Sequence, residues 1–160
     1  MEKFDIKFIK EFINKHKNSK IILGVDSQRI RKKGVKYATV VIVHYDGCHG
    51  GKIFADVTYE KTRDAKLSRP FNRMMKEVQL ISDLYTQLED VLIDADFEIH
   101  IDVNPKEGTG SNVAYNAAKG YIWGVVGVEP ICKPDAWGAS AAADRFTKGK
   151  TKSINKNKIK

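Results

Sequence analysis

The spacing of apolar residues along the chain predicts an ordered series of helices and strands. Phe4, Phe8 and Phe12 recur every four residues, and this period predicts an amphipathic helix over residues 3–16. Runs rich in Val and Ile between Gly and polar residues are typical of strands, while helical spacing after Pro70 predicts a long helix. The strands are predicted at residues 21–26, 37–45, 52–59, 98–103 and 128–133, and the later helices at about 70–88, 111–126 and 135–146.

The order of these elements, α-βββ-α-β-α-β-α, predicts an α/β fold. The strand at 21–26 is almost entirely apolar, as expected for a central strand that is covered on both faces. A chain of 160 residues has the usual size of one domain. We therefore expect a single domain over residues 1–147, followed by a lysine-rich tail at 148–160 that we expect to be disordered.

The net charge of +8, from 28 basic and 20 acidic residues, favours a polyanionic partner. Six of those charges are lysines of the tail, so residues 1–147 are nearly balanced. No apolar run approaches the roughly 18 residues of a membrane span. The amino-terminal segment is charged throughout, unlike a secretory signal, and two cysteines do not make a disulfide framework. We therefore expect a cytoplasmic protein with no membrane and no disulfide partner.

Acidic residues stand at the ends of predicted buried strands. Asp26 ends the first strand and Asp102 lies near the end of the fourth, although a buried acid is costly unless it is paired or binds a metal. If the two strands are parallel neighbours, both carboxylates emerge at the edge where open α/β sheets build their sites. Glu77, on the flank of the long helix, and Asp135, in the first turn of the last helix, are expected to face the same edge.

Four converging carboxylates repel one another and therefore need a cation. Ligands that are all oxygen suit Mg²⁺ or Mn²⁺. Two such ions, about 3.5–4 Å apart, hold the attacking water and the leaving oxygen of a phosphodiester. Taken singly, each acid also has an ordinary explanation, as a turn former, a solvated helix residue or an N-cap.

Asp144 competes with Asp135 for the fourth position. The two acids are nine residues apart, which on an α-helix places them on roughly opposite sides. We prefer Asp135, because it opens the predicted helix nearest the strand ends. Asp144 has Arg145 and Lys148 nearby, so a surface ion pair is expected there.

Basic residues follow the first acid directly and are candidates for contact with a phosphate backbone. A solvated hairpin loop is the alternative for this segment. Lys106 stands in a Gly-rich segment before a predicted helix, where it is a further candidate although ordinary helix capping explains the segment better. The nucleic-acid-binding candidates are Arg29, Arg31, Lys32, Lys33, Lys36 and Lys106.

Histidine and tryptophan residues have structural explanations that we prefer to functional ones. His44, Cys48 and His49 lie close together in the sequence, but no second pair stands at a usual zinc spacing. His100 alternates with isoleucines and is expected to be a packed or hydrogen-bonded residue. Trp137 is expected in the core or a groove wall, with base stacking as the alternative.

Three motifs together resemble the YkuK-type family of predicted ribonuclease H-related nucleases. They are residues 22–28 (ILGVDSQ), 100–105 (HIDVNP) and 133–148 (KPDAWGASAAADRFTK). The resemblance covers most of residues 19–148 and implies a ribonuclease H-like fold, with a mixed five-stranded sheet flanked by helices and an extra N-terminal helix. It also implies a two-metal site in which Asp26, Glu77, Asp102 and Asp135 are both catalytic and metal ligands. The first motif departs from the Asp-x-Glu of proofreading exonucleases, because residue 28 is Gln.

The leading hypothesis is thus a nuclease that uses Mg²⁺ or Mn²⁺ to hydrolyse phosphodiester bonds. The alternative is a nucleic-acid-binding module that keeps the same fold without useful catalysis. RNA, DNA and hybrid substrates all remain open. An ATPase of the actin-like type is excluded by size, because it needs two large lobes.

Overall fold

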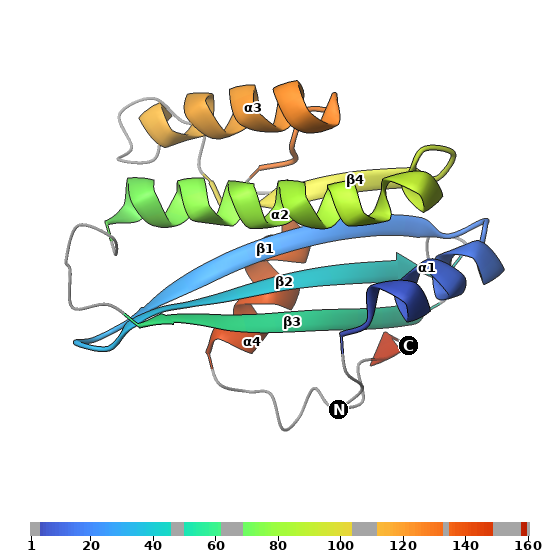
Figure 1. Cartoon of the computed structure of the whole chain (residues 1–160), viewed down its shortest axis with the longest axis horizontal. Coiled ribbons are helices and arrows are strands. Elements are labelled where there is room, and N and C mark those ends of the chain that lie inside the picture. Colours follow the sequence, from blue (N-terminus) through green and yellow to red (C-terminus); the bar gives the residue numbers. More distant parts are fainter. Residues whose placement is uncertain are drawn as a thin grey trace.

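The chain folds into a mixed β-sheet with helices on both faces (Figure 1). The computed structural model describes residues 4–45, 50–61, 69–103, 112–132, 135–148 and 158–159. The strands are β1 (Lys20–Ile30), β2 (Gly34–His44), β3 (Gly51–Lys61), β4 (Asp96–Ile101) and the two-residue β5 (Lys158–Ile159). Their order across the sheet is β4-β1-β2-β3-β5. β1 is antiparallel to β2 and parallel to β4, and β2 is antiparallel to β3, so β1 to β3 form a meander and the predicted central position of β1 is confirmed.

The predicted strand at 128–133 is wrong, and the body of the sheet has four strands instead of five. Of residues 128–132, which the structure describes, Ile131 alone pairs with β4, as a single parallel bridge to His100. Its N–H donates to the carbonyl of Ile99 at 2.7 Å, and it accepts from the N–H of Ile101 at 3.0 Å. Within the described residues, the pairing between this segment and β4 is limited to that one bridge. The short β5 pairs with the first residues of β3, at the other edge of the sheet.

The hairpin between β1 and β2 is longer than predicted. Residues 27–36 were expected to form a basic loop, but the pairing continues until Ile30 lies opposite Gly34. Only residues 31–33 form the turn, in which Lys32 has a positive φ of 62°. Charged side chains fit in this longer hairpin because its tip lies beyond the helices that cover the rest of the sheet (Figure 1).

Two helices, α1 (Ile6–Lys15) and α2 (Pro70–Leu92), cover one face of the sheet. The carboxylate of Asp5 caps α1 by accepting a hydrogen bond from the N–H of Lys7 at 2.9 Å. Pro70 occupies the first turn of α2, as predicted. Odd-numbered residues of β1 pack against these helices in the larger core, and α3 (Asn112–Val126) lies alongside α2. Among the described segments, no helix has both the length and the apolar character to cross a membrane.

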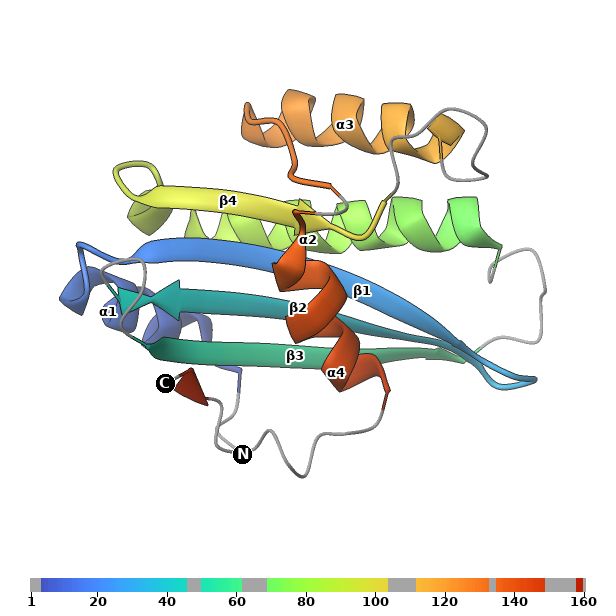
Figure 2. The ribbon, with the colours of Figure 1, turned by 180° about the vertical axis from the view of Figure 1, so that it is seen from behind.

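The opposite face is covered by a π-helix, η2 (Gly138–Ala143), that continues into α4 (Asp144–Thr147) (Figure 2). The last helix therefore begins at Gly138, later than the predicted residue 135. Its small residues allow close packing, since a Cβ on Gly24 would clash with the carbonyl oxygen of Gly138. Phe146 then packs with Ala38 and Val40 in a second, smaller core.

Candidate active site at the carboxyl ends of β1 and β4

Two of the predicted acids lie side by side where β1 and β4 end their pairing. The last register pair is Val25 with Ile101, so Asp26 and Asp102 are the next residues on neighbouring strands. Side chains alternate along a strand, and both acids have the parity of Ile22 and His100, which face η2. Asp26 is only 6% exposed. The sequence-based expectation that these two carboxylates share one edge of the sheet is consistent with this register.

Glu77 reaches the same edge from α2, on the other face of the sheet. Ser27 follows Asp26 and has the opposite parity, and its side chain hydrogen-bonds the carboxylate of Glu77. Burial raises the pKa of Glu77 well above its ordinary value, and the charges of Asp26 and Asp102 raise it further. Arg73, one helical turn earlier on α2, acts in the opposite direction. Glu77 thus belongs electrostatically with the strand acids.

The fourth acid that the structure brings to this edge is Asp144, the first residue of α4. A hydrogen bond between the carboxyls of Asp144 and Asp26 contributes to the raised pKa of Asp26. Thr147 Oγ1, one turn further, lies 3.4 Å from Asp26 Oδ2. Lys148 Nζ lies 2.9 Å from Asp144 Oδ2, so the predicted surface ion pair is confirmed, although Asp144 also contacts the cluster.

Asp135, which the sequence favoured for the fourth position, is exposed and precedes the last helix. The argument for it assumed that it opened the helix nearest the strand ends, and that assumption is wrong because the helix starts at Gly138. The N–H of Asp135 donates to the carbonyl of Cys132 at 2.9 Å, in the turn that follows the Ile131 bridge. The structure therefore favours Asp144 as the fourth carboxylate.

The carboxylate cluster, defined as Asp26, Glu77, Asp102 and Asp144, places acidic groups where their charges raise the pKa values of Asp26 and Glu77. Burial, followed by the charge of Asp102, raises the pKa of Asp26 to about 7. Like charges held together in this way favour protonation or a bound cation. The donors are all carboxylate oxygens, a set that suits Mg²⁺ or Mn²⁺. Within the described residues, however, no three His, Cys, Asp or Glu side chains are arranged as a metal-binding group.

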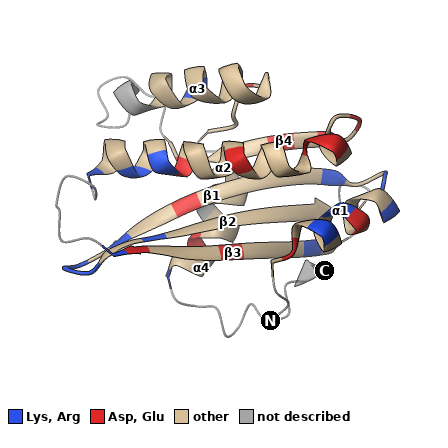
Figure 3. Cartoon of the chain, in the orientation of Figure 1, with Lys and Arg blue, Asp and Glu red and all other residues tan. Residues whose placement is uncertain are grey.

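The basic candidates follow the cluster along the β1–β2 hairpin (Figure 3). Arg29, Arg31, Lys32 and Lys33 are exposed, at or beside the turn. Lys36 is different, because it is buried and its Nζ lies 5.6 Å from the centre of the Tyr59 ring. Lys106 lies outside the described residues.

A groove that sequence reasoning missed runs between this hairpin, β3 and the end of α4. Its lining includes Tyr59 and Lys148, neither of which was a candidate. Tyr59 pairs in register with Lys36 across β2 and β3, and that contact depends on strand register, which the sequence alone does not show. The sequence assigned Lys148 to the basic tail and to an ion pair with Asp144, but not to a groove.

His100 has the structural role that its alternation with isoleucines predicted. It is buried, its Nδ1 accepts from the N–H of Gly138 at 3.0 Å, and its Nε2 lies 3.4 Å from Glu98 Oε2. Burial lowers the pKa of His100. The Trp137 ring meets it edge-on, with 5.8 Å between ring centres, so Trp137 lies at the start of η2 against the sheet. These contacts fix the beginning of the helix that carries Asp144.

The remaining metal candidates of the sequence lie apart from this edge. His44 ends β2 and packs its ring against Trp137. Cys48 and His49 lie outside the described residues. Cys132 is a free, half-buried thiol, and burial raises its pKa to about 11.

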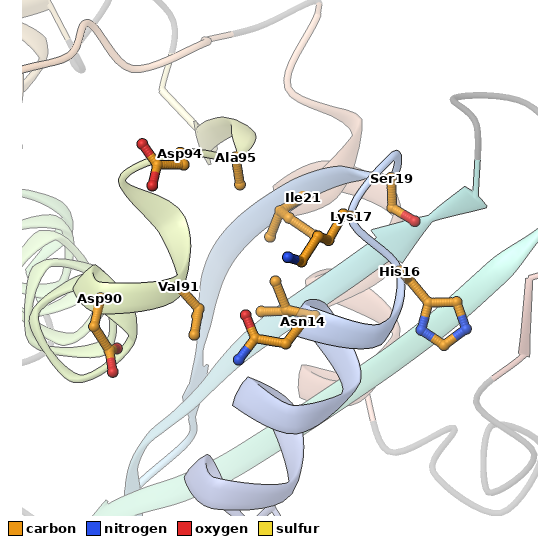
Figure 4. A pocket seen from close by; sticks show the side chains of 10 residues that line it. Asn14, His16, Lys17, Ser19, Ile21, Asp90, Val91, Asp94 and Ala95 are labelled. Carbon is orange, nitrogen blue, oxygen red and sulfur yellow. The ribbon is translucent and has the colours of Figure 1, made fainter.

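A separate pocket lies near the amino end of β1, between the ends of α1 and α2 (Figure 4). Asn14 and Lys17 line one side, and Asp90 and Asp94 line the other. Its floor includes Ile21, five residues before Asp26, which is roughly 16 Å along an extended strand. This pocket is therefore distinct from the carboxylate cluster.

Comparison with known proteins agrees with this arrangement. A family model described as Ribonuclease H-like matches residues 6–148, a span that contains β1 to α4 and the whole carboxylate cluster. Searches among curated proteins and among solved structures found no match. Since the family model covers most of the chain, the protein belongs to the ribonuclease H-like family.

Proposed function

We propose that the protein is a metal-dependent nuclease that hydrolyses phosphodiester bonds in nucleic acid. The observation that carries the proposal is the convergence of carboxylates from β1, α2, β4 and α4 on one edge of a ribonuclease H-like fold. We assign the carboxylate cluster as the ligands of Mg²⁺ or Mn²⁺, with two ions in all. Asp144 takes the role for which the sequence favoured Asp135.

In this mechanism the protein supplies ligands and no side-chain nucleophile. When bound, the ions activate water and stabilise charge on the leaving oxygen. Asp26 is central, because it contacts Asp144 and lies next to Asp102. Ser27 holds Glu77 and Lys148 holds Asp144, so each outer carboxylate has a partner that orients it. Because the pKa of Asp26 is about 7, protons compete with metal below neutral pH.

The exposed cations of the hairpin support a nucleic acid as the substrate. Arg29, Arg31, Lys32 and Lys33 lie on the strand and turn that follow Asp26. Cations placed this way neutralise backbone phosphates and give binding that weakens with salt.

The test compares Asp144→Asn and Asp102→Asn with Asp135→Asn, in Mn²⁺-dependent cleavage of RNA, RNA–DNA hybrid and single-stranded DNA. Loss of a metal-binding carboxylate should reduce cleavage by about 10²–10³-fold, the usual effect of removing a group that stabilises charge in the transition state. Asp135→Asn is the matched control and should cleave within about twofold of the wild type. Wild-type cleavage by Asp144→Asn would refute the assignment of the fourth ligand, and wild-type cleavage by both cluster variants would refute the site.

A binding module without catalysis is the second candidate. It is favoured by one observation, the lack of a preformed metal-binding group among the described residues. Titration calorimetry with Mn²⁺ separates the two. The module predicts salt-dependent affinity for nucleic acid with no heat of metal binding, whereas the nuclease predicts metal binding that Asp26→Asn abolishes.

A further inference from the structure

A row of side chains crosses the sheet just beyond the point where α4 ends. The strand register aligns Gln28 of β1 with Lys36 of β2, and Lys36 with Tyr59 of β3. Because side chains alternate along a strand, this row lies on the same face as Asp26, one step closer to the hairpin tip. The helix ends at Thr147, which contacts Asp26. The row of Asp26 is therefore covered, whereas the next row is open.

This open row is the floor of a groove with basic walls. Tyr59 is 63% exposed, whereas Lys36 is only 7% exposed. The Nζ of Lys36 lies 5.6 Å from the centre of the Tyr59 ring, a cation–π contact that helps to hold the ring in place. The side chains that the argument uses are Gln28, Arg29, Arg31, Lys36, Tyr59 and Lys148.

The groove adjoins the carboxylate cluster. Thr147 belongs to the groove lining and lies 3.4 Å from Asp26 Oδ2. Lys148 belongs to the same lining and forms the ion pair with Asp144. The charges of Asp26 and Asp102 add to that of Asp144 in raising the pKa of Lys148. A chain that lies in the groove is thus led directly to the proposed metal ligands.

We propose that this groove binds one strand of a single-stranded nucleic acid, with an unpaired base stacked on Tyr59. The inference rests on the proposed function, because it names the substrate class of that same site. An exposed aromatic ring beside cations is the combination used by proteins that bind single strands, where bases stack on rings and phosphates meet basic side chains. A base inside a duplex has both faces covered by its neighbours and offers no face to Tyr59.

The charges of the groove suit phosphates. Arg29 and Arg31 are exposed along its wall. Within the described residues, Lys36 contacts the ring of Tyr59 and forms no ion pair with a carboxylate. A buried cation without a carboxylate gains from an anion that arrives with the ligand. A phosphate next to the stacked base supplies that anion.

The experiment measures the affinity of the full chain by fluorescence anisotropy, with EDTA present to prevent cleavage. The probes are a fluorescein-labelled 12-nucleotide single strand, as DNA and as RNA, and the blunt duplex of the same sequence. Tyr59→Ala should bind the single strand about tenfold more weakly, since stacking on one ring is worth that much per base. Tyr59→Phe keeps the ring and should bind within twofold of the wild type. Trp123→Ala, which removes an aromatic of similar exposure (59%) on α3, should have no effect.

Duplex affinity provides the contrast, and Tyr59→Ala should leave it unchanged. Undiminished single-strand binding by Tyr59→Ala, an equal loss for single strand and duplex, or a wild type that binds no single strand would each overturn the inference. The proposed function fails separately. If the wild type binds single strands through Tyr59 but cleaves nothing with Mn²⁺, the groove inference stands and the proposed nuclease function fails. If cleavage depends on metal and Tyr59→Ala leaves the KM unchanged, the nuclease function stands and the groove inference fails.

Discussion

The parallel strands β1 and β4 are joined by opposite charges at one end and bring like charges together at the other. At the amino end, Lys20 of β1 forms an ion pair with Glu98 of β4. Burial acts to raise the pKa of Glu98, but hydrogen bonds from Lys20 and His100 bring it below its usual value. At the carboxyl end, burial and the charge of Asp102 together raise the pKa of Asp26 to about 7.

The difference separates the amino end of the β1–β4 pair, where charges stabilise the fold, from the carboxyl end, where we propose the active site. The amino end gains stability from its charges, because Lys20 and Glu98 carry opposite charges and form an ion pair. The carboxyl end loses stability through the repulsion of its acids, a pattern that is common where a protein holds a cation or performs acid–base chemistry. This loss of stability occurs in a chain that belongs to the ribonuclease H-like family.

Neutralising one acid at each end should give opposite results, and this is the largest effect we expect. Asp26→Asn should reduce metal-dependent cleavage by about 10²–10³-fold, yet raise Tm at pH 8 because a repulsive charge is gone. Glu98→Gln should leave cleavage within about twofold while it lowers the free energy of unfolding by about 1 kcal/mol. Both are measured by cleavage assays and thermal melting of the same preparations.

The direction of the change in Tm and the size of the loss of cleavage test the comparison between the two ends. A lower Tm in Asp26→Asn would show that the acid stabilises the fold, contrary to the comparison. A loss of cleavage in Glu98→Gln that equals the loss in Asp26→Asn would show that the two ends do not differ in function.

A second prediction concerns the position between the two ends, where η2 packs closely on β1. A Cβ at residue 24 would meet the backbone of Gly138 and the Val40 side chain. Gly24→Ala should therefore destabilise the protein by about 2–4 kcal/mol, since a backbone contact cannot yield as a flexible side chain does. Gly124→Ala on α3 is the matched control, because nothing lies within 4 Å of its added Cβ.

Denaturant unfolding measures both glycine variants. Gly124→Ala should be neutral or stabilising by up to about 1 kcal/mol, as expected for alanine in a helix. Equal stability of Gly24→Ala and the wild type would mean that η2 is not held against β1 at this point, and with it the placement of Asp144 would fail.

Hydrophobic periodicity predicts most of the fold and three of the four acids of the carboxylate cluster. It locates β1 to β4 and α1 to α3, because their apolar residues recur at strand or helix spacing and pack into the core. The sequence places an acid at the end of each of two apolar runs, and the parallel pairing of β1 with β4 sets Asp26 beside Asp102. Glu77 is predictable for the same reason, since it flanks the apolar stripe of α2.

The last helix is where sequence reasoning fails, for a physical reason. Residues 138–143 (GASAAA) are all small, so no apolar stripe marks the start or the winding of the helix. Spacing by 3.6 residues per turn does not apply in η2, which is a π-helix, although that spacing was used to place Asp135 and Asp144 on opposite sides. The preference for Asp135 depended in turn on the predicted start of the helix. The contact that selects Asp144 comes from Asp26, more than 100 residues earlier in the chain. The burial of Lys36 beside Tyr59 likewise depends on the register between β2 and β3, which the local sequence does not reveal.

The smallest predicted effect is a dependence of stability on pH that differs with and without metal. The pKa of Asp26 is about 7 in the folded protein, against an ordinary value of 3.8, and the pKa of Glu77 is raised as well. The folded state therefore holds protons that the unfolded state releases, so Asp26 reduces stability progressively from about pH 4 to pH 7 and fully above it, and Glu77 acts in the same direction. Bound metal offsets this loss of stability only at pH values at which the acids are ionised. Saturating Mn²⁺ should thus raise Tm by about 5 °C at pH 8 and by much less at pH 5.

Thermal melting at the two pH values, with and without Mn²⁺, measures this effect against Asp26→Asn and Asp135→Asn. Asp135→Asn should respond as the wild type does, because its carboxylate lies outside the cluster. Asp26→Asn should lose most of the Mn²⁺ response and, without metal, should lose less stability than the wild type between pH 5 and pH 8. An equal Mn²⁺ shift at both pH values in the wild type would place the ion on acids of ordinary pKa. The contrast between the two ends of the β1–β4 pair would then have no bearing on metal binding.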